Sequence, residues 1–161
     1  MLNRHPQKFQ FGVSLIESMV ALLVISIGLL GIAALQISAM KQNSSAYWHS
    51  QSVWIAYDMA DRIRANFIQF NGYIGTDTST GYSQDCETNA CSPAQILIDD
   101  QQALTDQVSS LPSGRALITS LVANQLNITV MWDDDGTGAT GTGCSNDTSA
   151  DLTCYLVTVA Q

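Results

Sequence analysis

Histidine and catalytic motifs are scarce in this sequence. Its 161 residues include two histidines, and the second of them, His49, stands alone in a helical pattern. The chain shows no histidine-paired nucleophile, no phosphate-binding glycine loop followed by lysine, and no cluster of metal-ligating residues. The acidic pair Asp99 and Asp100 is expected on an exposed helix, without an apolar pocket to raise a pKa. We therefore expect a protein that is not an enzyme and that carries neither cofactor nor metal.

Positive charge is also in short supply. Six lysines and arginines stand against fourteen aspartates and glutamates, which gives a net charge of −8 and a pI near 4.2. Binding to phosphate backbones needs clustered basic side chains. The four basic residues beyond position 12 are scattered: Lys41, Arg62, Arg64 and Arg115. This composition excludes a general nucleic-acid-binding surface.

Proline is absent between Pro6 and Pro93, so the chain can form one long helix there. The segment from Val13 to Leu35 is apolar except for Glu17 and is long enough, at about 35 Å, to cross a bilayer core of about 30 Å. Basic residues precede it, which predicts a single span with a cytoplasmic N-terminus. No small-residue cleavage site of the ordinary secretory kind follows Leu35.

The helical pattern continues beyond the apolar segment to about Phe67. Apolar residues recur there at spacings of three, four and seven, which is typical of an amphipathic helix. The expected apolar stripe consists of Ala46, Val53, Ala56, Ala60, Ile63, Phe67 and Phe70. The first half of the whole helix, which runs from Val13 to about Phe67, would lie in a membrane or fibre, and its second half would lie on a folded head.

The N-terminus resembles the signal of type IV prepilins. Basic Lys8, then Gly12, then Val13 as a new first residue and Glu17 at the fifth mature position follow the pattern of that family residue by residue. The resemblance implies cleavage between Gly12 and Val13 by a prepilin peptidase, which also methylates the new amine. The chain would then consist of a leader (1–12), a transmembrane or fibre-core segment (13–40) and an exported head (41–161).

Glu17 is the residue to which this resemblance gives a physical role. A carboxylate inside the apolar phase and the freed amine of Val13 are each costly alone, and they can neutralise one another. Between neighbouring subunits, such a pair would fix the axial step of a polymer. The alternative is a glutamate near the helix end that extends its carboxylate to the lipid headgroups.

A second string, Ala56-Tyr57-Asp58-Met59-Ala60-Asp61-Arg62-Ile63-Arg64-Ala65-Asn66, is similar to a box of PilV-type minor pilins. The resemblance implies a protein of the inner membrane, with its head in the periplasm, that later lies at the pilus tip. Its partners would be other minor pilins, the major pilin, the prepilin peptidase and, in many members, a large tip adhesin. The string from Ala56 to Asn66 contains four charged residues: Asp58, Asp61, Arg62 and Arg64. They either form a solvated face with local ion pairs or contact a neighbouring subunit.

Three other functions remain open at this point. A minor pseudopilin of type II secretion shares the same N-terminal pattern. A single-pass membrane protein could carry an exported binding or enzymatic domain. A DNA-uptake pilin is disfavoured because the head is acidic and has no basic patch.

The second half of the chain predicts a short helix and three strands, and hence an α+β fold in which a long helix lies on a small antiparallel sheet. The short helix is expected to start at Ser92-Pro93-Ala94-Gln95, which forms a capping box. It is expected to end at Leu111-Pro112-Ser113-Gly114. The apolar stripe of that helix is Leu97, Leu104, Val108 and Leu111. Residues 115–122, 126–132 and 153–160 alternate as strands do, and the last two are expected to pair.

Four cysteines, all beyond the apolar segment, indicate an oxidising compartment. They allow three pairings, among which the sequence does not select. We expect the local scheme of Cys86 with Cys91 and of Cys144 with Cys154, the latter similar to the C-terminal disulfide region of pilins. The loop between the last two strands is acidic, and Asp133, Asp134 and Asp135 are expected to form a solvated turn. A loose calcium site there is the alternative.

Overall fold

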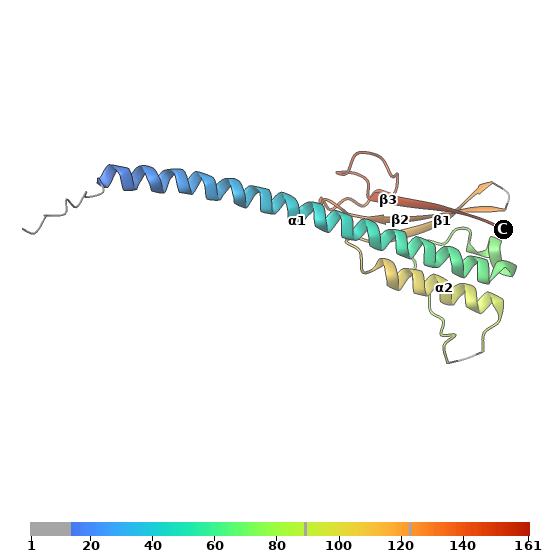
Figure 1. Ribbon diagram of the computed structural model, residues 1–161. Coiled ribbons are helices and arrows are strands. Elements are labelled where there is room, and N and C mark those ends of the chain that lie inside the picture. The colour runs from blue at the N-terminus through green and yellow to red at the C-terminus, as the bar shows by residue number, and fades with distance from the viewer. Residues whose placement is uncertain (1–13, 89, 123) are drawn as a thin grey trace, which may run out of the picture. The chain divides into compact units, whose positions relative to one another are not determined.

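The computed structural model of the chain describes residues 14–88, 90–122 and 124–161 (Figure 1). The chain divides into two compact units, Met1–Gln42 and Asn43–Gln161. Helix α1 (Leu15–Ala65) is followed by the 3-10 helix η1 (Phe67–Tyr73) and by helix α2 (Pro93–Val108). Strands β1 (Arg115–Val122), β2 (Gln125–Trp132) and β3 (Thr153–Ala160) complete the fold. The predicted α+β class is confirmed.

The described part of the first unit is a single stretch of α1. Helix α1 contains one window that is long and apolar enough, by length and composition, to cross a membrane, and its mean hydropathy is 2.5. None of that window is buried within the protein. The expected leader (1–12) and the new first residue Val13 lie outside the described residues.

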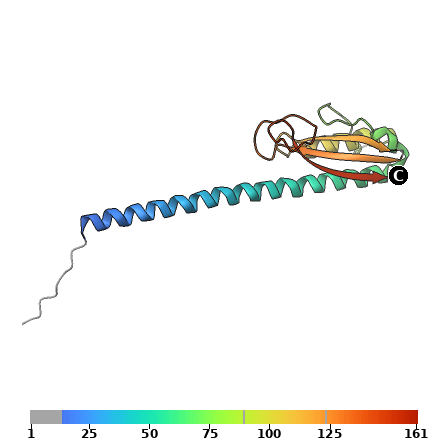
Figure 2. The same ribbon diagram turned by 90° about the horizontal axis from the view of Figure 1, so that it is seen from above.

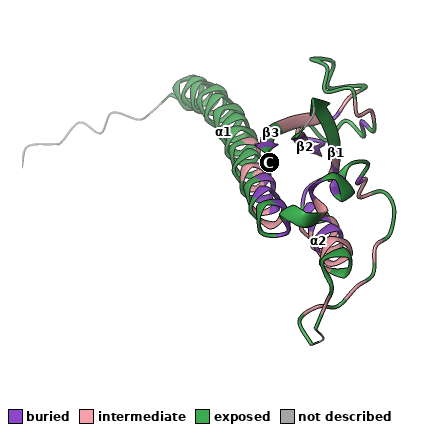
Figure 3. Ribbon diagram, turned by 90° about the vertical axis from the view of Figure 1, so that its right-hand side faces the viewer, coloured by how far each residue is buried: buried purple, intermediate pink, exposed green. Residues whose placement is uncertain are grey.

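In the second unit, α1 buries one face against the rest of the head (Figure 3). The buried residues of this face are Ser52, Ile55, Ala56, Met59, Ala60 and Ile63. The predicted stripe is therefore partly wrong, because Ala46 and Phe67 are exposed. Ala46 lies ten residues before Ala56, which at about 100° per residue places it well off the buried face. The α-helix ends at Ala65, so Phe67 begins a 3-10 helix and leaves the helical phase.

Strands β1, β2 and β3 form a sheet in that order, with both pairs antiparallel (Figure 2). The expected pairing of 126–132 with the last strand is confirmed, with Leu126 opposite Val159 and Trp132 opposite Thr153. Alternation along β2 places one set of side chains in the core, as predicted: Leu126, Ile128, Val130 and Trp132. These side chains pack with the buried face of α1 and with Leu104 and Val108 of α2 in one cluster.

Helix α2 begins as the sequence predicts. Ser92 caps it, its hydroxyl accepting from the Gln95 N–H while the Gln95 side chain accepts from the Ser92 N–H. The helix ends at Val108, three residues before the expected end, and Leu111 lies buried in the turn that follows. The apolar side of α2 packs in the core cluster with residues of α1, and the helix also lies against η1 and β1.

Candidate assembly site

Glu17 stands in the first turn of α1 and is exposed. Its backbone N–H donates to the Ser14 carbonyl over 3.0 Å, which begins the helix. The unpaired N–H groups of a helix N-terminus favour a carboxylate at this position. Large apolar side chains surround the carboxylate along the helix, beginning with Leu15 (81% exposed) and Ile16 (69% exposed). The structure thus presents a charged group inside an otherwise apolar surface.

Apolar side chains cover every side of α1 between Leu15 and Met40, and all of the large ones are exposed. The one side-chain hydrogen bond described in this stretch joins the Ser26 hydroxyl to the Leu22 carbonyl over 2.7 Å, within the helix. A helix that is apolar all round is stable only when lipid or protein covers it. This segment therefore requires a surrounding that the single chain does not supply.

The predicted charged box of α1 divides into two parts in the head. The Arg62 guanidinium donates from Nε to Asp58 over 2.8 Å and from Nη1 to Asp100 over 3.2 Å. Gln107 of α2 also donates to Asp58, over 2.9 Å. Asp58 and Arg62 therefore form a local ion pair, as one of the two interpretations expected, but they are half-buried and connect α1 to α2 and do not lie on a solvated face. Burial raises the Asp58 pKa, but hydrogen bonds from Gln107 and Arg62 outweigh it and lower the pKa.

Asp100 lies at the centre of this connection and is 4% exposed. The Tyr73 hydroxyl donates to its second oxygen over 2.5 Å. Asn66, the last residue of the box, donates from Nδ2 to the Tyr73 hydroxyl (3.1 Å) and to the Pro93 carbonyl (2.9 Å). Burial and the hydrogen bond to Asp100 raise the pKa of Tyr73 strongly, so the phenol remains a proton donor.

The expectation that Asp100 lies on an exposed helix surface is therefore wrong. Asp100 is three residues after Leu97 and four before Leu104, so it shares the face that α2 buries. That spacing was visible in the sequence and could have identified the residue. What the sequence did not show was its partner, because Arg62 is 38 positions away.

The other half of the box stays in solvent. Arg64 donates to Asp61 over 2.8 Å, and the two side chains are 52% and 77% exposed. Exposed ion pairs of this kind contribute at most about 1 kcal/mol. Asp61 and Arg64 are thus the charged members of this string whose side chains stay mostly exposed.

The structure contains two disulfides, and both are local. Cys86 is bonded to Cys91 in the loop before α2, and Cys144 is bonded to Cys154 at the start of β3. The second bond fixes the long acidic loop to the sheet.

The acidic turn after β2 differs from the solvated turn that we expected. Asp133 is 8% exposed and accepts hydrogen bonds from the N–H groups of Thr137 (3.0 Å) and Gly138 (2.8 Å). These backbone donors lower the pKa of Asp133. Asp134 accepts from the Trp132 indole over 3.0 Å and from Ser45 of α1 over 2.6 Å. Within the described residues, no group of three or more acidic, histidine or cysteine side chains is placed to hold a metal ion.

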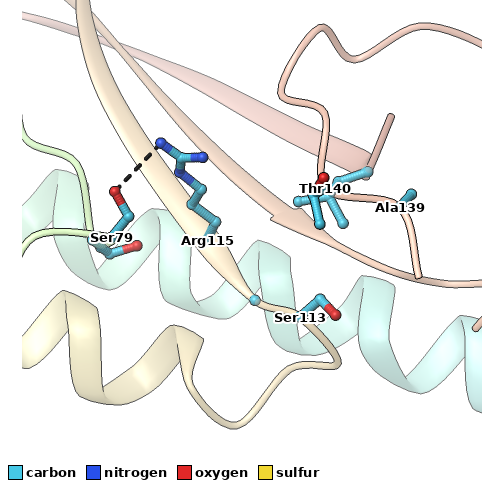
Figure 4. A pocket seen from close by; sticks show the side chains of 8 residues that line it. Ser79, Ser113, Arg115, Ala139 and Thr140 are labelled. Carbon is cyan, nitrogen blue, oxygen red and sulfur yellow. Dashed lines mark hydrogen bonds between the residues drawn. The ribbon is translucent and has the colours of Figure 1, made fainter. Parts of the chain in front are cut away.

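A shallow pocket of about 310 Å³ lies between the turn before β1 and the loop that follows β2 (Figure 4). Arg115 lines it, but its guanidinium is occupied: it donates to both oxygens of Asp77, over 3.0 and 2.6 Å, and weakly to Ser79. This bidentate pair attaches the segment around Asp77 to the edge of β1, where Asp77 bridges Leu117. Arg115 therefore has a structural role.

The Arg115–Asp77 pair gives a pH dependence with a defined sign. The hydrogen bonds from Arg115 lower the pKa of Asp77 from 3.8 to about 2. A carboxyl group with a lowered pKa stabilises the fold above its unfolded pKa, and this stabilisation disappears as the pH falls through the folded value. We expect the free energy of unfolding to decrease from pH 3.8 to about 2, and Arg115→Gln to reduce that decrease. Urea unfolding followed by tryptophan fluorescence at several pH values measures it. Arg64→Gln, which removes the same charge from an exposed position, is the control and should keep the wild-type slope.

A long N-terminal helix with an apolar span, packed on a small antiparallel sheet, is consistent with the type IV pilin fold. Residues 7–33 match the prokaryotic N-terminal methylation motif, and residues 34–100 match a family described as type IV pilin Tt1218. Comparisons with curated proteins and with solved structures gave no significant match. The two matches and the fold support a type IV pilin, a class of proteins that are in general structural.

Proposed function

We propose that the chain is a minor pilin of the PilV kind, which joins other minor pilins in the complex that primes pilus assembly and caps the tip. The string from Ala56 to Asn66 supports this role, because it is the part of the head that resembles those proteins. Its inner members connect α1 to α2 through Asp100, and its outer members Asp61 and Arg64 pair with each other while their side chains are mostly exposed. In this proposal the outer pair contacts a neighbouring pilin, and the complex presents a large adhesin.

The proposed maturation precedes assembly. Residues 1–12 form a leader that stays in the cytoplasm while residues 13–40 cross the inner membrane and residues 41–161 fold in the periplasm. The prepilin peptidase cuts between Gly12 and Val13 and methylates the new amine. The match of residues 7–33 to the methylation motif supports the proposed processing at the N-terminus.

The observation that carries the proposal is the position of Glu17. It is an exposed carboxylate in the first turn of α1, in a stretch from Leu15 to Met40 whose large apolar side chains are all exposed. Covering that surface with lipid or with neighbouring helices removes the carboxylate from water, which is costly unless a cation meets it. The methylated amine of Val13 from the adjacent subunit is the cation that a growing filament would bring to Glu17.

A strain that lacks the protein tests the function against its nearest alternative. We expect far fewer surface pili, counted by electron microscopy, and unchanged export of type II substrates, measured in the culture medium. Expression of the full chain restores the pili. Normal piliation together with lost secretion would instead identify a minor pseudopilin, and normal results in both assays would favour a membrane-anchored domain with a separate task.

A further inference from the structure

The two edges of the sheet differ in how they are protected. The edge of β1 is covered, because the segment from Gly75 to Thr78 pairs with it: the Gly75 N–H donates to Ile118, the Ile118 N–H to Thr76, and the Thr78 N–H to Ala116. A shift of register between Ser120 and Val122 interrupts the rest of that edge. Covering segments and bulges are the usual means by which proteins prevent edge strands from pairing with other chains.

The edge of β3 has no such protection along most of its length. On the side that faces β2, the Gln161 N–H donates to the Asn124 carbonyl, which shows which residues of β3 bond to β2. Since bonding alternates along an antiparallel ladder, the odd-numbered residues of β3 face β2, and the backbone groups of Cys154, Leu156, Thr158 and Ala160 face outward. At Leu152, just before the strand, the outward N–H is still bonded to Gly141. Among the described residues, none forms a backbone hydrogen bond with the outward groups beyond that point.

The sequence of β3 also lacks the residues that block pairing. Its eight residues, TCYLVTVA, contain no charge and no proline, and its pairing with β2 has no register shift. Leu156 is 51% exposed on the outer face. On the inner face, Tyr155 and Val157 pack against the core but are only half-buried, so the core is incompletely covered at this edge.

We propose that β3 is a docking edge at which an extended segment of another protein adds a fourth strand to the sheet. A row of outward N–H and C=O groups bonds to water in the free protein, and an added strand is the protein element that can replace this water along the whole row. Apolar side chains at alternate positions of the added strand would cover Tyr155 and Val157. Because fourteen acidic and four basic residues follow Gly12, the segment should carry basic and not acidic flanking residues.

A second copy of this chain fits the edge less well. In Figures 1 and 2, β3 ends beside the C-terminal end of α1, so strand and helix run in the same direction within the head. Antiparallel pairing of two β3 edges would set the α1 helices of the two heads antiparallel. Resting on the proposed function, in which all chains leave one membrane in the same direction, this antiparallel self-pairing is disfavoured, and the proposal assigns the partner strand to a different protein.

The test uses the full chain in detergent micelles and a synthetic probe peptide, Thr-Val-Thr-Val-Thr-Val with two lysines at each end. Hydrogen exchange is followed for single amides by NMR. We expect the outward amides of Leu156 and Thr158 to exchange about tenfold more slowly, or slower still, when the peptide is bound. The amides of Tyr155 and Val157, already bonded to β2, should not change. A peptide with prolines in place of the central two residues is the control and should have no effect.

Variants at one position separate the backbone from the side chain. Leu156→Pro removes an outward N–H without removing a bond to β2, and should abolish the effect of the peptide. Leu156→Thr keeps the N–H and should retain it. Unchanged exchange in the wild-type chain at saturating peptide overturns the proposal, as does slow exchange that appears without peptide and depends on protein concentration, which indicates self-pairing. Because the assay uses purified protein, such a failure leaves the role in pilus assembly to be decided by the deletion strain.

Discussion

Glu17→Ala is expected to leave the protein in the membrane and to remove it from filaments. A charged side chain costs about 2.5–3.5 kcal/mol at mid-bilayer on insertion scales and less near the helix end, where Glu17 lies, so replacing its carboxylate by a methyl group should not harm membrane insertion. In the filament, the same change leaves the amine of the neighbouring subunit without an anion in apolar surroundings. Such an uncompensated charge costs several kcal/mol, which corresponds to a reduction of incorporation by about a hundredfold or more.

Fractionation of membranes and of sheared pili, each followed by immunoblotting, measures the two quantities separately. Ser26→Ala, which removes a hydroxyl from the same apolar helix, is the matched control and should be incorporated normally because its bond to Leu22 is internal. Glu17→Asp, which keeps the charge on a shorter side chain, should retain part of the wild-type incorporation. Mass spectrometry of the mature N-terminus establishes that each variant is still cut and methylated at Val13. If Glu17→Ala enters filaments at the wild-type level, the proposed pairing is wrong.

Local patterns predicted most of the secondary structure. Alternation of apolar residues identified β2 and its pairing with β3, and the Ser92 capping box identified the start of α2. These features depend on residues close together in sequence, where period and hydrogen-bonding capacity act directly. The apolar stripe of α1 was predicted less well, because Ser52 is buried despite its hydroxyl, which is satisfied by the His49 carbonyl within the helix.

The partners of the buried charges and the open sheet edge could not be predicted in the same way. Asp100 and Asp133 are buried because particular donors meet them, and the donors to Asp100 come from residues 27 and 38 positions away. The periodicity of residues within one helix or strand does not predict such a long-range hydrogen bond. The difference between the edges of β1 and β3 depends on the order of strands in the sheet and on where the segment from Gly75 to Thr78 lies. Both are properties of the topology, which the alternation within one strand does not determine.

The second large effect concerns Arg62 and Arg64 of α1. These two arginines are two residues apart, but Arg62 contacts a buried carboxylate and Arg64 an exposed one. Arg62→Ala is expected to lower the free energy of unfolding by about 2–4 kcal/mol, because it leaves the buried Asp100 carboxylate with Tyr73 as its remaining side-chain donor. Arg64→Ala removes an exposed pair with Asp61 and should cost less than about 1 kcal/mol. Urea unfolding of both variants, followed by tryptophan fluorescence at neutral pH, measures the difference.

A double substitution shows whether the stability lost in Arg62→Ala comes from the unpaired Asp100 carboxylate or from the missing methylene groups of Arg62. In the Asp100→Asn background the buried charge is absent, so Arg62→Ala should cost clearly less than it does in the wild type. Equal costs in the two backgrounds would mean that Arg62 acts by covering apolar surface with its methylene groups, and not by neutralising Asp100. In that case the contacts among Arg62, Asp100 and Tyr73 would be a consequence of helix packing, and the attachment of α2 to α1 would depend mainly on the apolar cluster.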